Sequence, residues 1–516
     1  MARSLLVLVL LAALAGCAAT ADIAAGPGTG RTLGEPPGGF DDDDGDDDDG
    51  DDDDAGDDDD TAPLGDAARG LDVVGISVNQ GVQTWLMLDR AVANEGPIVA
   101  GRPLLLRVHV ATQPGWVPRA IRAVVTWSPG GSAPPVVLPS TITPYGDSED
   151  GVLASTFAVD VPAALVTLTA SVRVGLYEVA GGNGAGNSIQ ATWPVSGDQP
   201  VPVEFNGGRL HVHVVPLRFD ADGSGRLPDT SQGQLALLSE WLFRVYPTAS
   251  VELTVEANPI STSANAQANG NGWGDLLYQV TDLRDELDLP DDVYIYGMFR
   301  PADDFGSWCA AGCVAGLSWR ADDPNDVTSR ASIGLGYAGE GAAGTLIHEV
   351  GHAHGRAHAP CGVSSPDPSF PYSDGSLGRW GWDLVSRTLK HPTEHRDLMG
   401  YCTPRWVSDY TWEALNDRIA WANSAPLWRE QGPPIRLLRL AVDPDGTIHA
   451  RGVTERRVPP EGKSMAVVLR DELGDGTPAL GTYVPFDDID GGTIFVPAPS
   501  AEHVAVELDG VRIPLD

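Results

Sequence analysis

The stretch that decides the fold of this chain is residues 348–358, which read HEVGHAHGRAH. His348 and His352 are four positions apart, so a helix places both side chains on one face, one turn apart. Two neutral imidazoles in that arrangement can bind one Zn²⁺ from the same side. Glu349 lies between them and can reach a zinc-bound water without occupying a ligand position. The spacing therefore predicts a metal-binding helix.

A turn after this helix can supply a third ligand. Gly355 can adopt a positive φ, which ends the helix and brings His358 back towards the metal. The fourth position then stays open for water, as hydrolysis requires. A helix with merely satisfied histidines would explain one of them, but not three together with the glutamate and the glycine. His354 lies on a different helix face from His352, so we expect it to be structural or solvated.

The pattern H-E-x-x-H-x-x-G-x-x-H resembles the signature of the metzincin zinc endopeptidases. The resemblance implies that His348, His352 and His358 bind zinc and that Glu349 is the general base. The residue after the third histidine is Ala359, where several metzincin families have Glu, Asp or Ser, so the subfamily stays open.

The resemblance also implies a methionine turn beneath the zinc. The sequence DLMGYC at residues 397–402 places Met399, one of five methionines, before a glycine and a tyrosine. Some metzincins use a tyrosine two positions after this methionine to ligate zinc or to stabilise the oxyanion, and Tyr401 stands there. Packing alone is an equal alternative for Tyr401.

The N-terminus predicts export. A charged start and a short apolar run precede Leu14-Ala15-Gly16-Cys17, which resembles a bacterial lipoprotein processing site. We expect a lipoprotein signal peptide over residues 1–17, lipidation at Cys17, and a lipid-anchored protein of the bacterial cell envelope, at the outer membrane or cell surface. An ordinary signal peptide cleaved after a small residue is the alternative.

Four further cysteines predict disulfide bonds. An even number in an exported chain favours two bridges, and four cysteines allow three pairings. We prefer Cys309–Cys313 as a small loop and Cys361–Cys402, which would join the loop of the third zinc ligand to the methionine turn. A cysteine zinc site is the weaker alternative because the spacings do not repeat.

Charge is concentrated near the N-terminus. The net charge is −39, and sixteen aspartates lie within residues 41–60. Mutual repulsion keeps such a tract extended, so we expect a disordered Asp-rich tether over residues 18–69. The rest of the chain still carries −23, obtained by removing those sixteen charges from −39, which argues against nucleic-acid binding. We expect a monomer that meets the membrane only through its lipid anchor.

Short apolar runs separated by Gly- and Pro-rich turns predict β-sandwich regions on both sides of the metal motif. Residues 70–200 are expected to form an immunoglobulin-like β-sandwich, and residues 433–516 a second, smaller one. Neither contains a motif that carries chemistry. The fold class expected for the chain is an α+β metzincin-like zinc protease domain flanked by all-β sandwich domains.

Residues 201–432 are expected to form that catalytic domain. Apolar residues at helical spacing predict a helix capped by Thr230 or Ser231 and further helices over about 275–287 and 408–423. In metzincins an edge strand pairs with the extended substrate, and Ala331–Leu335 is the candidate.

Two other segments of this domain contain possible metal ligands. His211 and His213 face the same side of an expected strand, but without an acidic neighbour such a pair is more often structural. Asp220–Gly225 resembles part of a calcium loop but lacks the closing glutamate, so we interpret it as a turn and keep Ca²⁺ as a second candidate ion.

These features predict a zinc-dependent endopeptidase that hydrolyses peptide bonds of extracellular proteins or glycoproteins through a Glu-activated, zinc-bound water. An extended polypeptide or glycoprotein is the expected substrate. The architecture is similar to that of secreted bacterial mucin-cleaving metalloproteases. The alternative is a non-catalytic surface lipoprotein, a binding or adhesion module with a structural zinc site, although Glu349 speaks against it because a structural site needs no base.

Overall fold

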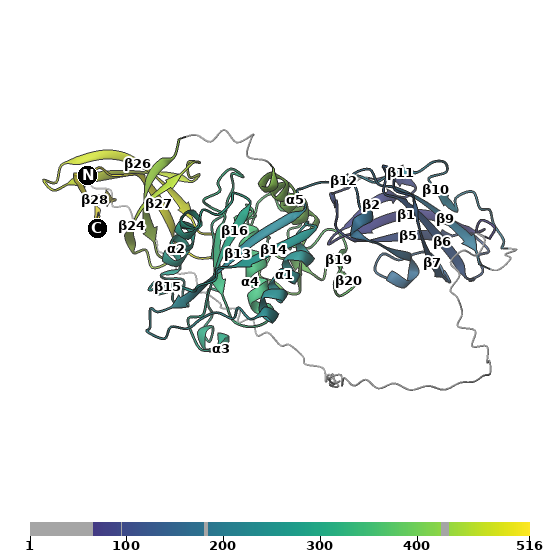
Figure 1. The fold of residues 1–516 in the computed structure, drawn as a ribbon, viewed down its shortest axis with the longest axis horizontal. Coiled ribbons are helices and arrows are strands. Elements are labelled where there is room, and N and C mark those ends of the chain that lie inside the picture. Colours follow the sequence, from purple (N-terminus) through teal and green to yellow (C-terminus); the bar gives the residue numbers. More distant parts are fainter. Residues whose placement is uncertain (1–64, 94, 180–183, 425–432, 516) are drawn as a thin grey trace, which may run out of the picture. The chain divides into compact units, whose positions relative to one another are not determined.

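The structure is a computed structural model that describes residues 65–93, 95–179, 184–424 and 433–515. The expected signal peptide, Cys17 and most of the expected tether lie outside the described residues. Within these ranges no helix is both long enough and apolar enough to cross a membrane. Figure 1 shows the order of the elements along the chain.

The N-terminal region consists of two antiparallel sheets that share one apolar core. One has the strand order β3-β2-β1-β5-β8 and the other β10-β9-β6-β7, with β11 also paired to β9. Alternating burial along β6 is what a strand with one face on the core requires. The strands are β1 (Leu71–Asn79), β2 (Gln83–Leu88), β3 (Ala91–Val92), β5 (Leu104–Thr112), β6 (Ile121–Ser128), β7 (Val136–Ile142), β8 (Phe157–Val161), β9 (Ser171–Glu178), β10 (Thr192–Trp193) and β11 (Gln199–Pro200), with two short 3₁₀ turns, Leu153–Ser155 and Ala163–Leu165.

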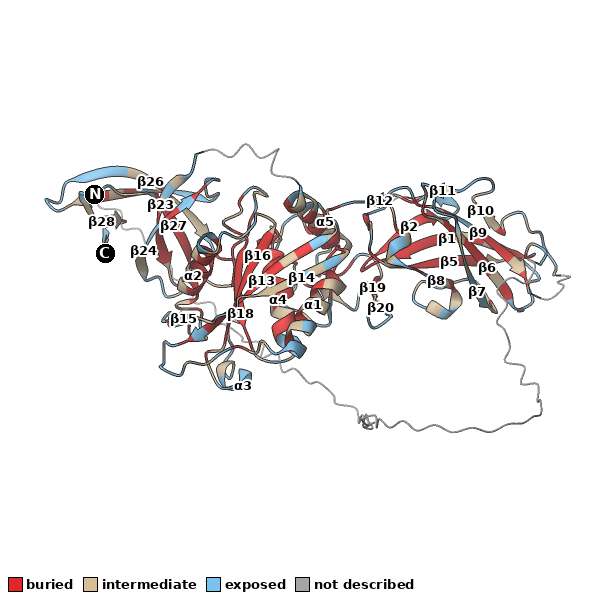
Figure 2. Cartoon of the chain, in the orientation of Figure 1, coloured by how far each residue is buried: buried red, intermediate tan, exposed pale blue. Residues whose placement is uncertain are grey.

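A mixed sheet with the order β14-β13-β16-β18-β17 lies at the centre of the next region. Its first four strands are parallel, β17 is antiparallel, and β15 extends the pairing of β13. Every residue of β16 is buried, as expected for an inner parallel strand covered on both faces (Figure 2). The strands are β13 (Arg209–Phe219), β14 (Ser250–Val255), β15 (Ile260–Thr262), β16 (Val293–Phe299), β17 (Gly316–Ser318) and β18 (Ala331–Leu335); β12 (Val203–Glu204) pairs with β4 (Ile98–Val99).

Helices cover both faces of this sheet. The helices α1 (Gln232–Val245), α4 (Glu340–Ala353) and α5 (Asp409–Asn423) share one core with β13 and β16, whereas α2 (Trp273–Glu286) packs on the opposite face. Ser231 and Ser408 cap α1 and α5, because each side-chain oxygen accepts a hydrogen bond from a backbone N–H of the first turn. The short elements are α3 (Phe305–Trp308), β19 (Gly381–Asp383), β20 (Thr388–Lys390), β21 (Arg396–Asp397) and β22 (Arg405–Trp406).

The sheet order corrects one expectation. Ala331–Leu335 (β18) was expected at the edge, but β18 lies between β16 and β17. The edge strand is β17, which follows the Cys309–Cys313 loop and runs antiparallel to β18. A three-residue strand is too short to carry a periodic hydrophobic pattern, and its position depends on pairing that the local sequence does not encode.

The C-terminal region takes the form of one seven-stranded sheet instead of the second sandwich that was expected, with the order β24-β23-β27-β26-β25-β28-β29. This sheet curls, since its two outermost strands, β24 and β29, approach each other. All of its neighbouring strands are antiparallel. The strands are β23 (Ile435–Val442), β24 (Ile448–Arg456), β25 (Lys463–Asp471), β26 (Gly476–Pro485), β27 (Gly492–Pro497), β28 (His503–Leu508) and β29 (Val511–Pro514).

Candidate metal centre and active site

The helix α4 places the first two histidines of the motif on one face. It ends at Ala353, and Gly355 follows with φ 81°, a conformation that favours glycine. A Cβ on Gly355 would lie 2.5 Å from Nη2 of Arg418 and 2.7 Å from the carbonyl oxygen of Ala321, so the close approach also requires glycine. This turn returns the chain and brings His358 to the same place as the two helical histidines.

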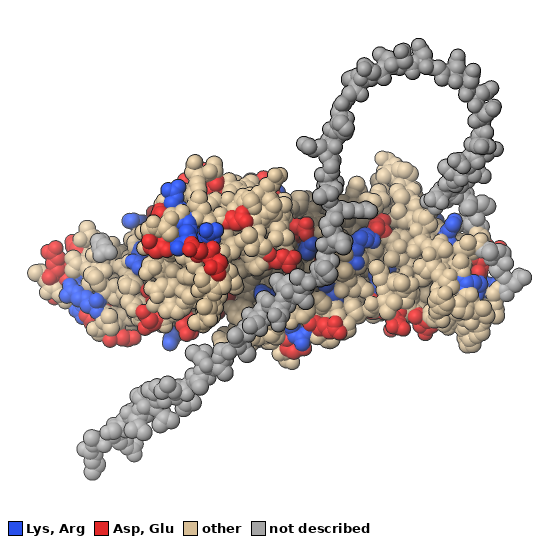
Figure 3. All heavy atoms as spheres, turned by 90° about the horizontal axis from the view of Figure 1, so that it is seen from below, with Lys and Arg blue, Asp and Glu red and all other residues tan. Residues whose placement is uncertain are grey.

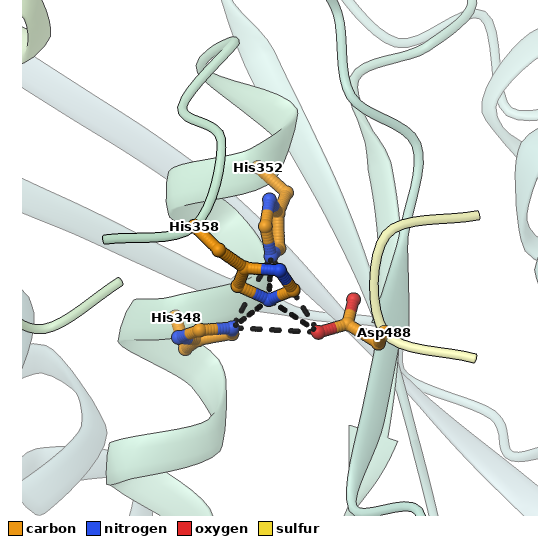
Figure 4. Close-up of side chains that lie close together, drawn as sticks. All are labelled: His348, His352, His358 and Asp488. Atoms are coloured by element: carbon orange, nitrogen blue, oxygen red, sulfur yellow. Dashed lines mark hydrogen bonds and ion pairs between the residues drawn. The ribbon is translucent and has the colours of Figure 1, made fainter. Parts of the chain in front are cut away.

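The Nε2 atoms of the three histidines converge (Figure 4). They lie 3.2 Å apart for His348–His352, 3.2 Å for His352–His358 and 3.3 Å for His348–His358. Four ligands around Zn²⁺ at the usual Zn–N distance are separated by about 3.3 Å, so the spacing fits a tetrahedral ion.

Hydrogen bonds on the far side of two rings orient these ligands. Nδ1 of His348 donates to the carbonyl oxygen of Leu398 at 2.9 Å, and Nδ1 of His352 donates to that of Arg356 at 2.6 Å. With the proton assigned to Nδ1, the lone pair of each Nε2 is free to bind a metal. This arrangement is typical of histidines that bind a metal.

A fourth group completes the cluster, and the sequence did not point to it. Asp488 lies in the turn between β26 and β27 of the C-terminal region, and its Oδ1 is 3.1 Å from Nε2 of His358, 3.4 Å from that of His348 and 3.6 Å from that of His352 (Figure 4). The four donors form a buried His₃Asp group that could bind a metal ion. The C-terminal region, whose sequence shows no motif that carries chemistry, thus contributes one side chain to this group.

Unpaired oxygen atoms support a cation at this place. Oε2 of Glu349 and Oδ2 of Asp488 are both buried and have no hydrogen-bond partner among the described residues. Two carboxylates close together in a buried setting repel each other, and a divalent cation bound by the neighbouring imidazoles would neutralise them. The residues present therefore fit a metal by distance, by donor chemistry and by charge.

The electrostatic shifts within the cluster have the same cause. Burial lowers the pKa of His348 to about 4. Burial also acts to lower the pKa of His352, but the charge of Asp488 outweighs it and the pKa is raised. Burial acts to raise the pKa of Asp488, yet the imidazoles around the carboxylate hold it well below its usual range. Burial, followed by the charge of Asp488, raises the pKa of Glu349 well above its ordinary value.

Glu349 lies against the edge strand. A Cβ added to Gly316 in β17 would lie 2.2 Å from Oε1 of Glu349, so glycine is needed for the strand to pass the carboxylate. The carboxylate is thus held between the metal-binding helix and the edge of the sheet. An acid–base group in that position can serve a polypeptide that pairs with β17.

Tyr401 lies beside the same cluster. Its phenol donates a hydrogen bond to Oδ1 of Asp488 at 3.0 Å and is 3.3 Å from Nε2 of His358. Burial, followed by the charge of Asp488, raises the pKa of Tyr401, so the phenol stays protonated and can act as a donor. The structure therefore brings Tyr401 together with the three histidines.

Met399 lies beneath the metal-binding helix. A Cβ on Gly351 of α4 would lie 2.4 Å from Sδ of Met399, so the two residues fit only because position 351 is glycine. The turn is held by Asp397, which is fully buried and accepts hydrogen bonds from the N–H groups of Met399 and Ser408, both at 2.8 Å. Sequence reasoning missed Asp397, although its place two residues before the methionine was visible.

The four described cysteines form two disulfide bonds. Cys309 is bonded to Cys313 and Cys361 to Cys402, the pairing preferred from the sequence. The second bond joins the segment after His358 to the methionine turn. His354 is structural, since its ring stacks on Tyr294 with 3.9 Å between the ring centroids.

The two weaker metal sites do not gain ligands among the described residues. The side chains of His211 and His213 both contact the hydroxyl of Thr254. Each does have an acidic neighbour, since Oε2 of Glu252 lies 4.0 Å from Nδ1 of His211 and Oε2 of Glu256 lies 3.7 Å from Nε2 of His213, but these four residues do not form a candidate metal group. In the Asp220–Gly225 turn, the carboxylate of Asp222 pairs with Arg226 instead of being free for calcium.

Comparison with known proteins indicates a peptidase. Residues 326–402 match the family Peptidase M66. The chain is similar to dictomallein of Burkholderia mallei (strain ATCC 23344) and of Burkholderia pseudomallei (strain K96243), with 26% identity over 248 residues in each case. The match covers 44% of this chain and 34% of each relative, so it spans about a third of the length of these curated relatives. The family match contains α4, His358 and the methionine turn, and together these similarities support a peptidase.

Proposed function

We propose that this chain is a zinc-dependent endopeptidase that cleaves peptide bonds of extracellular proteins or glycoproteins. The observation that carries the proposal is the convergence of three Nε2 atoms at 3.2–3.3 Å, with Glu349 on the same helix. The match of residues 326–402 to a peptidase family supports it. Imidazole ligands in a tetrahedral arrangement favour zinc.

The chain's own residues can perform each proton transfer. Zinc, when bound, polarises the scissile carbonyl and makes a water molecule more acidic. Glu349 takes the proton of the attacking water and then gives it to the leaving amine. Tyr401 can donate a hydrogen bond to the oxygen that becomes negative in the tetrahedral intermediate. The free edge of β17 offers backbone groups to an extended substrate next to Glu349.

Several parts of the proposal rest on resemblance. The metzincin-like assignment of the catalytic domain is supported by the glycine turn after α4 and by Met399 beneath it. Export, a lipid anchor at Cys17 and a place at the bacterial cell surface are proposed from the N-terminal sequence. The absence of a nucleic-acid partner is proposed from the net charge. On the face drawn in Figure 3, basic side chains are interspersed with acidic ones.

One observation favours the second candidate, a surface protein with a structural zinc site. Asp488 fills the position that a hydrolytic zinc keeps open, and four protein ligands are typical of structural sites. Glu349 distinguishes the two functions, because a structural site has no use for a buried base next to the ligands.

The test compares Glu349→Gln with a matched control, Glu340→Gln in the first turn of the same helix. Glu340 is exposed, so its loss should leave both zinc content and cleavage unchanged. Glu349→Gln should retain one zinc per chain, measured by elemental analysis, while cleavage of a mixed peptide library falls by about a hundredfold or more. Chelation should abolish cleavage by the parent chain, and added zinc should restore it. Full activity of Glu349→Gln with zinc bound would falsify the mechanism.

A further inference from the structure

We propose that Asp488 is a protein ligand that closes the fourth coordination position, so that the C-terminal region holds the peptidase latent until Asp488 is displaced. This inference rests on the proposed function and concerns the regulation of the same site. It assigns a role to the turn between β26 and β27, which connects two strands of a sheet outside the catalytic region.

The geometry makes Asp488 a competitor for the catalytic position. Its Oδ1 lies 3.1–3.6 Å from all three Nε2 atoms, which are the distances expected between two ligands of one ion. Its side chain is 6% exposed, and Tyr401 donates its phenolic hydrogen bond to the same oxygen. Water and a scissile carbonyl would need this place, because a hydrolytic zinc keeps one position free of protein ligands.

The turn is held in place by its neighbours. Asp487 accepts two hydrogen bonds from Nη1 of Arg320, to Oδ1 at 3.0 Å and to Oδ2 at 2.8 Å. The ring of Phe486 is buried and lies 5.7 Å, centroid to centroid, from the ring of Trp319. Trp319 and Arg320 directly follow the edge strand β17, so residues 486–488 run alongside the segment that leads from that strand. The turn thus lies beside the end of the edge strand that an extended substrate would pair with.

The C-terminal sheet is docked through an apolar core as well. Ala441, Phe486 and Phe495 belong to the same buried cluster as α2 and β16 of the catalytic region. Polar contacts surround it: the hydroxyl of Tyr278 is hydrogen-bonded to that of Thr493 at 2.6 Å, and both Nη atoms of Arg439 donate to Asp282 at 2.8 and 2.7 Å. Because this shared core fixes the position of the turn, docking of the C-terminal sheet places Asp488 in the metal group.

Latency follows from this arrangement. While the C-terminal sheet is docked, Oδ1 of Asp488 and the metal form a closed site, and Glu349 has no water molecule to activate. Displacement of the turn, by a substrate or by a partner that binds the C-terminal sheet, opens the fourth position. Asp488 is thus a regulatory ligand, whereas His348, His352 and His358 hold the metal in both states.

The first experiment reads the metal directly, in the full chain with Co²⁺ in place of zinc. Asp488→Ala is compared with Asp490→Ala, which changes an exposed aspartate of the same turn that is not part of the candidate metal group. Acetohydroxamate, a small ligand for an open position, should change the visible absorption of Asp488→Ala at concentrations about tenfold or more below those needed for the parent chain and for Asp490→Ala. A chelator should also remove zinc faster from Asp488→Ala. Equal hydroxamate responses in all three proteins would overturn the closed site.

The second experiment measures peptide cleavage by the zinc-loaded proteins. Asp488→Ala should cleave a mixed peptide library about tenfold or more faster than the parent chain, because the competent state is no longer a minor fraction. The double variant Asp488→Ala, Glu349→Gln should be inactive. If Asp488→Ala is as active as the parent or less active, latency is wrong. If every variant binds zinc and none cleaves any peptide, the proposed peptidase function itself has failed.

Discussion

The catalytic region has a β-rich neighbour on either side in the sequence, and the two neighbours contact it in different ways. The N-terminal sandwich contributes Val82 and Val99 to one of the apolar cores of the catalytic region. It also contributes Arg102, which is fully buried and donates to the carbonyl oxygens of Thr248 at 2.7 Å and Phe243 at 2.6 Å. No described residue of the sandwich belongs to the candidate metal group. The C-terminal sheet docks through an apolar core and contributes Asp488 to that group.

The role of a β-rich accessory region therefore depends on whether one of its turns contributes a side chain to the metal group. Both neighbours have strands of apolar, largely β-branched residues and no recognisable motif, so their sequences predict the same passive role. The two regions differ in that a turn of the C-terminal one contributes Asp488 to the metal group. If the N-terminal region only braces the catalytic region while the C-terminal region regulates it, substitutions at the two contacts should affect stability and cleavage differently.

The largest effect is expected from Arg102→Leu. Arg102 also donates from Nε to the carbonyl oxygen of Gln80 at 2.9 Å and from Nη2 to that of Arg244 at 3.4 Å, so four carbonyl groups lose this donor at once. The free energy of unfolding, measured by chemical denaturation, should fall by on the order of 3 kcal/mol. The response of the Co²⁺-loaded protein to acetohydroxamate should not change, because the sandwich does not reach the metal.

Arg90→Ala is the matched control for Arg102→Leu. Arg90 lies in the same sandwich, but its side chain is 45% exposed and pairs with Asp72 at the surface. Its loss should cost less than about 0.5 kcal/mol. If Arg102→Leu costs no more than Arg90→Ala, or if it opens the metal site, the view of the sandwich as a brace is wrong.

The sequence predicted what depends on local spacing. The four-residue interval of His348 and His352, the cap expected at Thr230 or Ser231 and the helix expected over about 408–423 all depend on residues within a few turns of each other. Such features depend only on residues close together in the sequence, so they can be predicted from one sequence. The strand Ala331–Leu335 was predicted with the bounds it has, yet its neighbours in the sheet were not.

The sequence could not predict what depends on packing between distant segments. Asp488 is separated from His358 by 130 positions, and its turn, with glycines and aspartates, reads like any other β-turn. Arg102 looks like a surface residue until the fold brings the carbonyl group of Thr248 to it. In both cases the function of the side chain comes from docking, and docking leaves no periodic signal along the chain.

A smaller and pH-dependent effect is expected in the N-terminal sandwich. His109 is buried there, with Nε2 at 3.1 Å from Oγ of Ser77, and burial, followed by the charge of Arg107, lowers its pKa to about 3. The carboxylate of Asp150 lies 3.4 Å away without reversing this. The unfolded chain takes up a proton at His109 near pH 6.5, whereas the folded chain does not until about pH 3.

Stability from His109 is therefore fully present above pH 6.5 and is lost as the pH falls from there towards 3. At about pH 5 the loss should be on the order of 2 kcal/mol relative to pH 7. His109→Gln, which cannot be protonated, should lose less stability over the same interval, measured by denaturation at both pH values. Parallel pH profiles of the parent and the variant would contradict the assignment. Zinc content should stay the same in both, in keeping with a region that does not reach the metal.

Asp282→Asn should change stability less than Arg102→Leu or the protonation of His109 does, and it tests the difference between the two neighbours most directly. Asp282 pairs with Arg439 of the C-terminal sheet, but its side chain is 42% exposed, so losing the pair should cost only about 1 kcal/mol of docking free energy. That shift raises the undocked fraction about fivefold. If the C-terminal sheet holds the peptidase latent, cleavage should rise by a few-fold with zinc content unchanged.

Asp160→Asn is the control, because Asp160 of the sandwich makes a two-hydrogen-bond pair with Arg387 of the catalytic region at 3.0 and 3.1 Å. It should leave cleavage unchanged, since undocking a brace frees no ligand. Equal effects of the two substitutions would show that the two neighbours do not differ in the way their contacts indicate.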